Sequence, residues 1–146
     1  MLRLAGELAD GVLLNYLPAS AVPWCIEQVR AGEQFAQREP GSCRVYAYVH
    51  VGVCDPDAAR PLGRKDLFSY AVVDAYAKAF ERAGFVDEIA ALRHAHDQRD
   101  RDAAVAAVSD RMVDAIDICG DAGNAQSTRG QVLCLLDAQL QLSTEV

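Results

Sequence analysis

An uninterrupted apolar segment near the start of the chain limits the fold more than any other feature of this sequence. Residues 11–16, GVLLNY, follow a short helical pattern over residues 2–9 and contain almost no polar positions. A continuous apolar run predicts a strand covered on both faces, as in a parallel sheet, because a half-solvated strand alternates instead. The chain therefore begins with a helix that leads directly into a buried strand.

A second strand is predicted over residues 43–53, CRVYAYVHVGV, which are rich in β-branched and aromatic residues and contain no proline. Between the two strands, residues 21–37 predict a helix with Cys25, Ile26 and Val29 on its apolar face. Pro40 and Gly41 then interrupt the chain. The order strand, helix, strand favours a parallel sheet.

Helices dominate the rest of the chain. Asp55-Pro56 predicts a helix start, with Pro61 and Gly63 breaking that helix early. Further helices are predicted over residues 65–83, 87–97 and 101–118, whereas residues 125–140 fit a helix or a strand. The expected fold class is a helix-rich α/β fold with two clear parallel strands. Because two parallel strands do not form a covered sheet that is stable alone, residues 1–146 predict a single domain that is part of a larger fold.

Composition excludes several classes of function. The net charge of −7 argues against a nucleic-acid-binding protein, which needs a basic face. No apolar run approaches the roughly 18–20 residues of a membrane span, and Arg3 and Glu7 interrupt the only N-terminal candidate for a signal peptide. The five cysteines lack paired ligand spacing, which predicts reduced, buried thiols in a cytoplasmic protein and no metal site. They are Cys25, Cys43, Cys54, Cys119 and Cys134.

Four segments together resemble the luciferase-like monooxygenase superfamily, and most closely its branch of oxidoreductases that depend on the deazaflavin coenzyme F420. The segments are LAGELADGVLLNYLP (4–18), VRAGEQFAQREP (29–40), VYAYVHVGVCDPDAAR (45–60) and SDRMVDAIDICGDA (109–122). The resemblance covers residues 1 to about 123 in the family's order. Its most specific part is the helix-to-strand motif that ends in Ala9-Asp10-Gly11.

The resemblance implies a (β/α)8 TIM barrel of roughly twice this length, of which the chain matches the C-terminal portion. It implies coenzyme F420 as cofactor, with FMN as the alternative, and hydride transfer to or from a small organic substrate. On this comparison Met1 corresponds to an internal methionine of a longer relative, so that we expect a truncated chain with a diverged tail over residues 124–146. No catalytic residue can be carried over, because in the family these residues come mainly from the N-terminal half.

Three residues are candidates for a cofactor or substrate pocket. In a barrel the active face lies at the carboxyl ends of the strands, where Asn15, Tyr16 and Gly52 are expected. Asn15 could bind a cofactor ring or satisfy loop amides, and Tyr16 could form a pocket wall or pack. Gly52 could permit close ligand approach or be a tolerated strand-end glycine. The sequence shows no obvious Asp or Ser near His50 for triad chemistry, so His50 is expected to be a core or interface residue.

Three functional classes remain open at this point. The first is an oxidoreductase of the resembled family, although we expect the chain alone to be inactive. The second is a non-catalytic truncated fragment that acts only through association with another chain, including a second copy of itself. The third is an independent small α/β domain with a binding role. The sequence does not identify the substrate.

Overall fold

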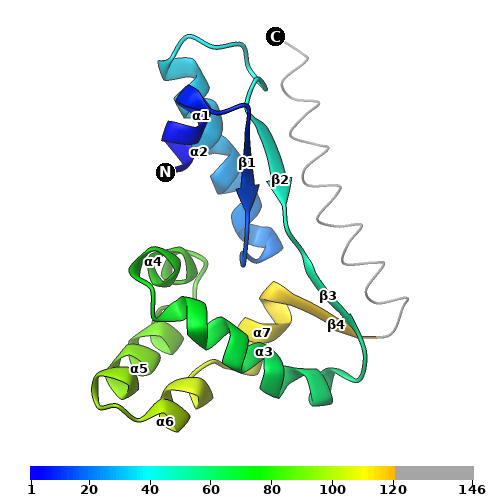
Figure 1. The fold of residues 1–146 in the computed structure, drawn as a ribbon, viewed down its shortest axis with the longest axis vertical. Coiled ribbons are helices and arrows are strands. Elements are labelled where there is room, and N and C mark those ends of the chain that lie inside the picture. Colours follow the sequence, from blue (N-terminus) through cyan, green and yellow to red (C-terminus); the bar gives the residue numbers. More distant parts are fainter. Residues whose placement is uncertain (121–146) are drawn as a thin grey trace. The chain divides into compact units, whose positions relative to one another are not determined.

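The computed structural model describes residues 1–120, so the predictions for residues 124–146 and 125–140 lie outside the described residues. The described chain divides into two compact units, one formed by residues 1–15 and 19–48 and the other by residues 16–18 and 49–120. Figure 1 labels their helices and strands. Within residues 1–120, no helix has the length and apolar character that a membrane crossing requires.

The first unit is a two-stranded parallel sheet with two helices. Its elements are α1 (Leu2–Leu8), β1 (Gly11–Leu14), the 3-10 helix η1 (Ala19–Ala21), α2 (Val22–Phe35) and β2 (Arg44–Ala47). β1 pairs with β2 in parallel, from Gly11 opposite Arg44 to Leu14 opposite Ala47, and Figure 1 shows the two strands side by side. The parallel pairing and the helix between the strands are confirmed, although β1 ends at Leu14 rather than Tyr16.

Two glycines allow α1 and α2 to pack with their backbones in contact. A Cβ atom at Gly6 would collide with the carbonyl oxygen of Val29, and one at Gly32 would collide with the carbonyl oxygen of Arg3. Each helix therefore carries a glycine at the point where the other helix passes. Arg38 strengthens this pairing, because its Nη1 donates to the carbonyl oxygens of Gly6 and Ala9 at the end of α1 (2.8 and 2.9 Å).

A buried carboxylate organises the turn between α2 and β2. The side chain of Glu33 is only 1% exposed and pairs with Arg30 at 2.8 Å. It also accepts hydrogen bonds from the backbone amides of Gly41 (3.0 Å) and Cys43 (2.6 Å). A buried charge needs such partners to offset its lost hydration. Glu33 is therefore a structural residue that fixes where β2 begins.

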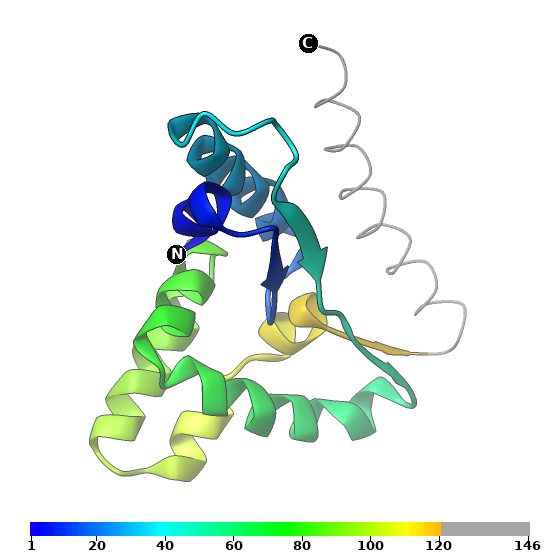
Figure 2. The ribbon, with the colours of Figure 1, turned by 45° about the horizontal axis from the view of Figure 1, so that its top comes forward.

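The second unit is mostly helical. Its elements are β3 (His50–Val53), α3 (Pro56–Ala71), α4 (Asp74–Arg82), α5 (Val86–Asp97), α6 (Arg101–Ala106), α7 (Asp110–Ile116) and β4 (Asp117–Gly120). β3 and β4 pair in parallel, with His50 opposite Asp117 and Gly52 opposite Cys119. Figure 2 shows α5 and α6 side by side. The largest fully buried side chains of this unit form one core: Leu67, Phe80, Ile89, Leu92, Val108, Met112 and Val113.

The prediction that Pro61 and Gly63 break the helix after Asp55 is wrong, because α3 continues through both residues. Asp55 caps the helix as expected, accepting a hydrogen bond from the amide of Asp57 at 3.0 Å. Gly63 is where α7 and β4 approach α3 closely, since a Cβ atom there would lie 2.8 Å from Val113 Cγ1 and 2.9 Å from Asp117 Oδ2. Tertiary packing on α3 therefore outweighs the local helix-breaking preference of these residues.

Three other predicted elements are divided in the structure. The helix predicted over 65–83 is shared between α3 and α4, and the strand predicted over 43–53 becomes β2 and β3. The helix predicted over 101–118 is interrupted by Ser109, whose side chain accepts a hydrogen bond from the amide of Met112 at 3.2 Å and caps α7. Its last residues belong to β4 instead, because Asp117 is extended and pairs with β3. The prediction of α5 is confirmed to within one residue.

Candidate functional site

Tyr16 has the most unusual backbone among the candidate residues. Its φ is 51°, in the left-handed region, and its side chain is buried with the residue only 4% exposed. A bulky residue in this conformation costs on the order of 1–3 kcal/mol, and such strain is concentrated at functional sites. Tyr16 lies two residues beyond the end of β1, whereas the sequence pattern placed it within the strand, at its carboxyl end. The strain must be offset by the contacts that the side chain makes.

Those contacts form a polar and aromatic cluster within the second unit. The Tyr16 hydroxyl donates a hydrogen bond to Oδ2 of Asp66 on α3. The Tyr16 ring lies 4.1 Å from the ring centroids of both His50 and Tyr70, and Tyr70 lies 4.9 Å from Tyr76. Burial, the hydrogen bond to Asp66 and the charge of Asp66 all raise the pKa of Tyr16. Tyr16 is therefore held as a neutral phenol that donates its proton.

Asp117 adds a second carboxyl group to the same cluster. It is the first residue of β4 and lies opposite His50 in the sheet register. Burial raises the pKa of Asp117, His50 lowers it, and the charge of Asp66 raises it again, with a net upward shift. Its buried Oδ1 atom has no hydrogen-bond partner within the part of the chain that the structure describes. A half-buried carboxyl group with an unpartnered buried oxygen is a candidate for holding a proton or binding a ligand.

The four groups can handle protons and orient a polar ligand. Tyr16 supplies a phenol, His50 an imidazole, and Asp66 and Asp117 two carboxyl groups of different environments. The pKa values of Tyr16 and Asp117 are both raised, so these two groups hold their protons to higher pH than usual. We define these four residues as the Tyr16 cluster.

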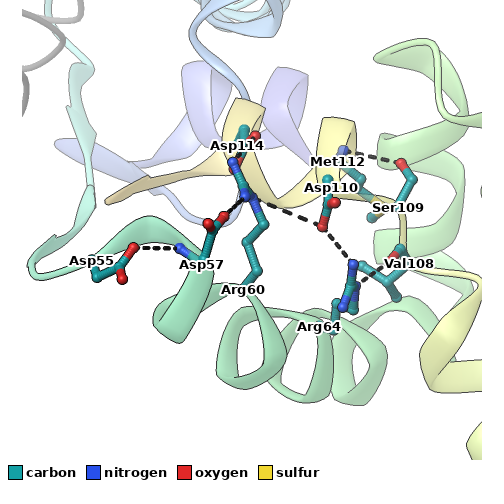
Figure 3. Close-up of polar contacts among 9 residues, drawn as sticks. All are labelled: Asp55, Asp57, Arg60, Arg64, Val108, Ser109, Asp110, Met112 and Asp114. Atoms are coloured by element: carbon teal, nitrogen blue, oxygen red, sulfur yellow. Dashed lines mark hydrogen bonds and ion pairs between the residues drawn. The ribbon is translucent and has the colours of Figure 1, made fainter. Parts of the chain in front are cut away.

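Ion pairs between α3 and α7 hold the helix that leads to Asp117. Arg60 binds Asp114 through Nε at 3.0 Å and Nη2 at 3.1 Å and also pairs with Asp57 (Figure 3). Arg64 binds Asp110 at 2.5 Å and the carbonyl oxygen of Val108 at 3.1 Å. These arginines join the two helices, and their charges are already matched by aspartates. They are therefore supports for the Tyr16 cluster rather than an anion site.

The structure separates the three residues that the sequence singled out. Tyr16 joins the cluster in the second unit, whereas Asn15 follows β1 and belongs to the first unit. Gly52 lies in β3 opposite Cys119. The space above Gly52 is lined by sulfur, since a Cβ atom there would be 3.2 Å from Cys54 Sγ and 3.4 Å from Cys119 Sγ. The ligand-binding roles of Asn15 and Gly52 stay predictions.

Sequence reasoning missed Asp66 and Asp117 and treated His50 as a core or interface residue. Asp66 lies on α3 with no neighbouring motif, so only the fold reveals that it faces Tyr16. The sequence pattern predicts a helix at Asp117, whereas in the structure this residue begins a strand. The cysteine prediction is correct for the buried Cys25 and Cys43 and wrong for Cys54, which is exposed, and for Cys119, which is half-buried.

Comparison with known proteins places this architecture in a family. The model of the luciferase-like monooxygenase family matches residues 1–132. A 5,10-methylenetetrahydromethanopterin reductase of Methanolobus tindarius is 30% identical over 136 residues, which are 91% of this chain and 41% of that relative. The solved structure of the coenzyme F420 dependent tetrahydromethanopterin reductase from Methanopyrus kandleri is similar in fold, with a TM-score of 0.58 at 21% identity.

The two similar proteins are considerably longer than this chain. All of the chain is covered by the match to the Methanopyrus kandleri structure, but only 47% of that structure is. The chain thus spans less than half the length of each relative. The family model nonetheless covers most of the residues, including both parallel strand pairs and the whole Tyr16 cluster. The chain therefore belongs to the luciferase-like monooxygenase family.

Proposed function

We propose that this chain contributes to an F420-dependent oxidoreductase that transfers hydride between the deazaflavin and a small organic substrate. The observation that carries the proposal is the Tyr16 cluster, a set of titratable groups around the buried Tyr16 beside a parallel strand pair in a member of this family. The similarity to a structure named as coenzyme F420 dependent supports F420, with FMN as the alternative cofactor. In this proposal residues 1–146 form the C-terminal portion of a (β/α)8 barrel.

The donor and acceptor groups of the Tyr16 cluster fit the polar edge of a flavin or deazaflavin ring. Such a ring presents carbonyl oxygens and an N–H group, and hydrogen bonds to this edge orient the ring and tune its electronics. The unpartnered Oδ1 of Asp117 and the imidazole of His50 are the groups that would hold it. A bound deazaflavin would supply the hydride. The cofactor phosphate would need another site, because Arg60 and Arg64 are already paired with aspartates.

The chain's own residues would orient the bound ligand and supply a proton to it. Tyr16, kept neutral by burial and by Asp66, holds its position through a hydrogen bond and two ring contacts. Asp117 retains a proton to higher pH than an exposed aspartate, because partial burial raises its pKa. Asp117 could carry that proton on Oδ1 and donate it to a carbonyl oxygen of the bound ligand. Asn15 and Gly52 stay separate candidates for contact with a ligand, each within its own unit.

Equilibrium dialysis of the 146-residue chain against coenzyme F420, with FMN in parallel, tests this proposal. We expect saturable binding at one site, weakened about tenfold by Asp117→Ala, which corresponds to the loss of one hydrogen bond to a carboxyl group. Asp97→Ala, at an exposed position on α5, is the matched control and should bind as the parent chain does. Absence of saturable binding by the folded chain to either cofactor would contradict the proposal.

A second candidate function, association with another chain without catalysis, is supported by one face of the β1–β2 sheet. Leu13 and Tyr46 are opposite each other in register and are 61% and 52% exposed, and Tyr48, just after β2, is 58% exposed. Parallel sheets are normally covered on both faces. A second copy of this chain is the simplest partner, since both copies would present the same apolar face.

Sedimentation velocity over a range of chain concentrations tests this second candidate. The proposal expects a reversible concentration-dependent increase in mass that Leu13→Lys abolishes. Leu62→Lys, at another exposed leucine on α3, is the control and should associate normally. A chain that stays monomeric at every concentration would exclude self-association through this face. Association without cofactor binding would favour the second candidate over the first.

A further inference from the structure

The thiols of Cys54 and Cys119 meet above a glycine that has no side chain to separate them. Cys119 on β4 is opposite Gly52 on β3, and Cys54 follows Gly52 by two residues. A Cβ atom at Gly52 would lie 3.2 Å from the Cys54 sulfur and 3.4 Å from the Cys119 sulfur. The two sulfurs therefore share the space over one Cα atom. A hydrogen bond with Cys54 is among the causes, after burial, that raise the pKa of Cys119.

Accessibility distinguishes this pair from the other described cysteines. Cys54 is exposed and Cys119 is half-buried, whereas Cys25 and Cys43 are buried in the first unit. Cys54 also lies in the bend between β3 and α3, outside regular structure. Its backbone can therefore adjust to the short Cα–Cα separation of about 4–7 Å that a disulfide requires. We infer that Cys54 and Cys119 are a redox site that forms a reversible disulfide between β3 and β4 on reaction with hydrogen peroxide.

The reaction divides into two balanced steps. The Cys54 sulfur, as thiolate, attacks one oxygen of the peroxide, so that an S–O bond forms, the O–O bond breaks and the departing hydroxide takes up a proton to become water. The Cys119 sulfur then attacks the sulfur of the Cys54 sulfenic acid. The S–S bond forms, the S–O bond breaks and a second water leaves with the Cys119 proton. The two thiols lose two electrons and the peroxide gains them.

The exposed position of Cys54 assigns it the first step. Peroxide must reach the sulfur that it oxidises, and Cys54 is the more exposed of the two thiols. Burial raises the pKa of Cys119 and so reduces its thiolate fraction, which suits it to the second step, where the sulfenic acid is already in contact. The chemistry of this site needs no cofactor, so the inference stands whether or not the chain binds F420.

Peptide mapping of the oxidised chain tests the inference directly. The Cys134→Ser chain is used as the parent, because Cys134 lies outside the described residues. After treatment with hydrogen peroxide and alkylation of free thiols, we expect one peptide pair joined through Cys54 and Cys119, lost on reduction with dithiothreitol. Sulfinic acid at Cys54 with Cys119 still alkylated, or cross-links between two chains, would overturn the inference.

Single substitutions add a second readout. Cys54→Ser and Cys119→Ser should each abolish the intrachain cross-link, and Cys43→Ser, which removes a buried thiol of the other unit, should leave its yield unchanged. Gly52→Ala should lower the yield, because its Cβ would occupy the space between the two sulfurs. Retention of the cross-link in Cys54→Ser would show that another pair forms it. The mapping of the parent chain decides the question even if a variant fails to fold.

Discussion

At the scale of single residues, the buried carboxyl group of Glu33 and the half-buried one of Asp117 have opposite surroundings. Glu33 accepts two backbone hydrogen bonds and pairs with Arg30. Asp117 has a buried oxygen without a partner in the described part of the chain, and its pKa is raised. A fully satisfied carboxylate stabilises the fold, whereas an unsatisfied one destabilises it and is retained where it serves a function. This contrast separates a structural acid from a candidate functional one.

Removal of the Glu33 carboxylate should destabilise the first unit. Glu33→Ala leaves the Gly41 and Cys43 amides without their acceptor and Arg30 without its carboxylate partner. We expect a loss of about 3 kcal/mol in the free energy of unfolding, measured by urea denaturation. Glu39→Ala, an exposed glutamate in the same turn, should change it by less than about 0.5 kcal/mol. Equal effects of the two substitutions would contradict a structural role for Glu33.

The raised pKa of Asp117 should make the free energy of unfolding depend on pH. Its pKa is higher in the folded chain than in the unfolded chain, so the folded state retains a proton that unfolding releases. Its contribution to stability is therefore present below the unfolded pKa and is lost as the pH rises through the folded pKa. Asp117→Asn should stabilise the chain relative to the parent at about pH 7 and not at about pH 3. A difference independent of pH, measured by urea denaturation, would contradict the raised pKa.

At the scale of helices and strands, the hydrophobic pattern predicts those elements whose formation depends mainly on their own residues. The strand β1 and the helix α5 follow from their own hydrophobic patterns. The strand β4 does not, because the residues before it have helical spacing and its extended form depends on pairing with β3, more than sixty residues away. Asp117 could not be predicted as a site residue for that reason. Asp66 could not be predicted either, because its partner Tyr16 is distant in the sequence. The cluster could be predicted only through Tyr16.

Close packing of α1 on α2 should make Gly32 intolerant of any side chain. Gly32→Ala places a Cβ atom against the Arg3 carbonyl group, which is backbone and cannot rotate away. We expect a loss of at least about 3 kcal/mol in the free energy of unfolding. Gly41→Ala is the comparison, since it has open space and only the strain of a φ of 86°, worth about 1–2 kcal/mol. A smaller effect at Gly32 than at Gly41 would contradict the packing.

At the scale of the whole molecule, the strands of residues 1–120 form two separate parallel pairs. Each sheet has two parallel strands, and the matched relatives are more than twice as long as the chain. Sheets of this size are weakly stable alone, and the exposed face of β1 and β2 is consistent with that. The account therefore depends on whether residues of the Tyr16 cluster meet the cofactor in this chain.

The most direct measurement is an NMR titration of the chain with coenzyme F420, using carbon-13 labels on tyrosine and aspartate side chains. The account predicts saturable shifts of the Tyr16 and Asp117 signals, assigned with Tyr16→Phe and Asp117→Asn, at the concentrations where dialysis shows binding. The signal of Tyr46, exposed in the first unit, should stay constant. Binding that leaves the Tyr16 and Asp117 signals unmoved, or an absence of binding, would contradict the assignment of the Tyr16 cluster as the cofactor site.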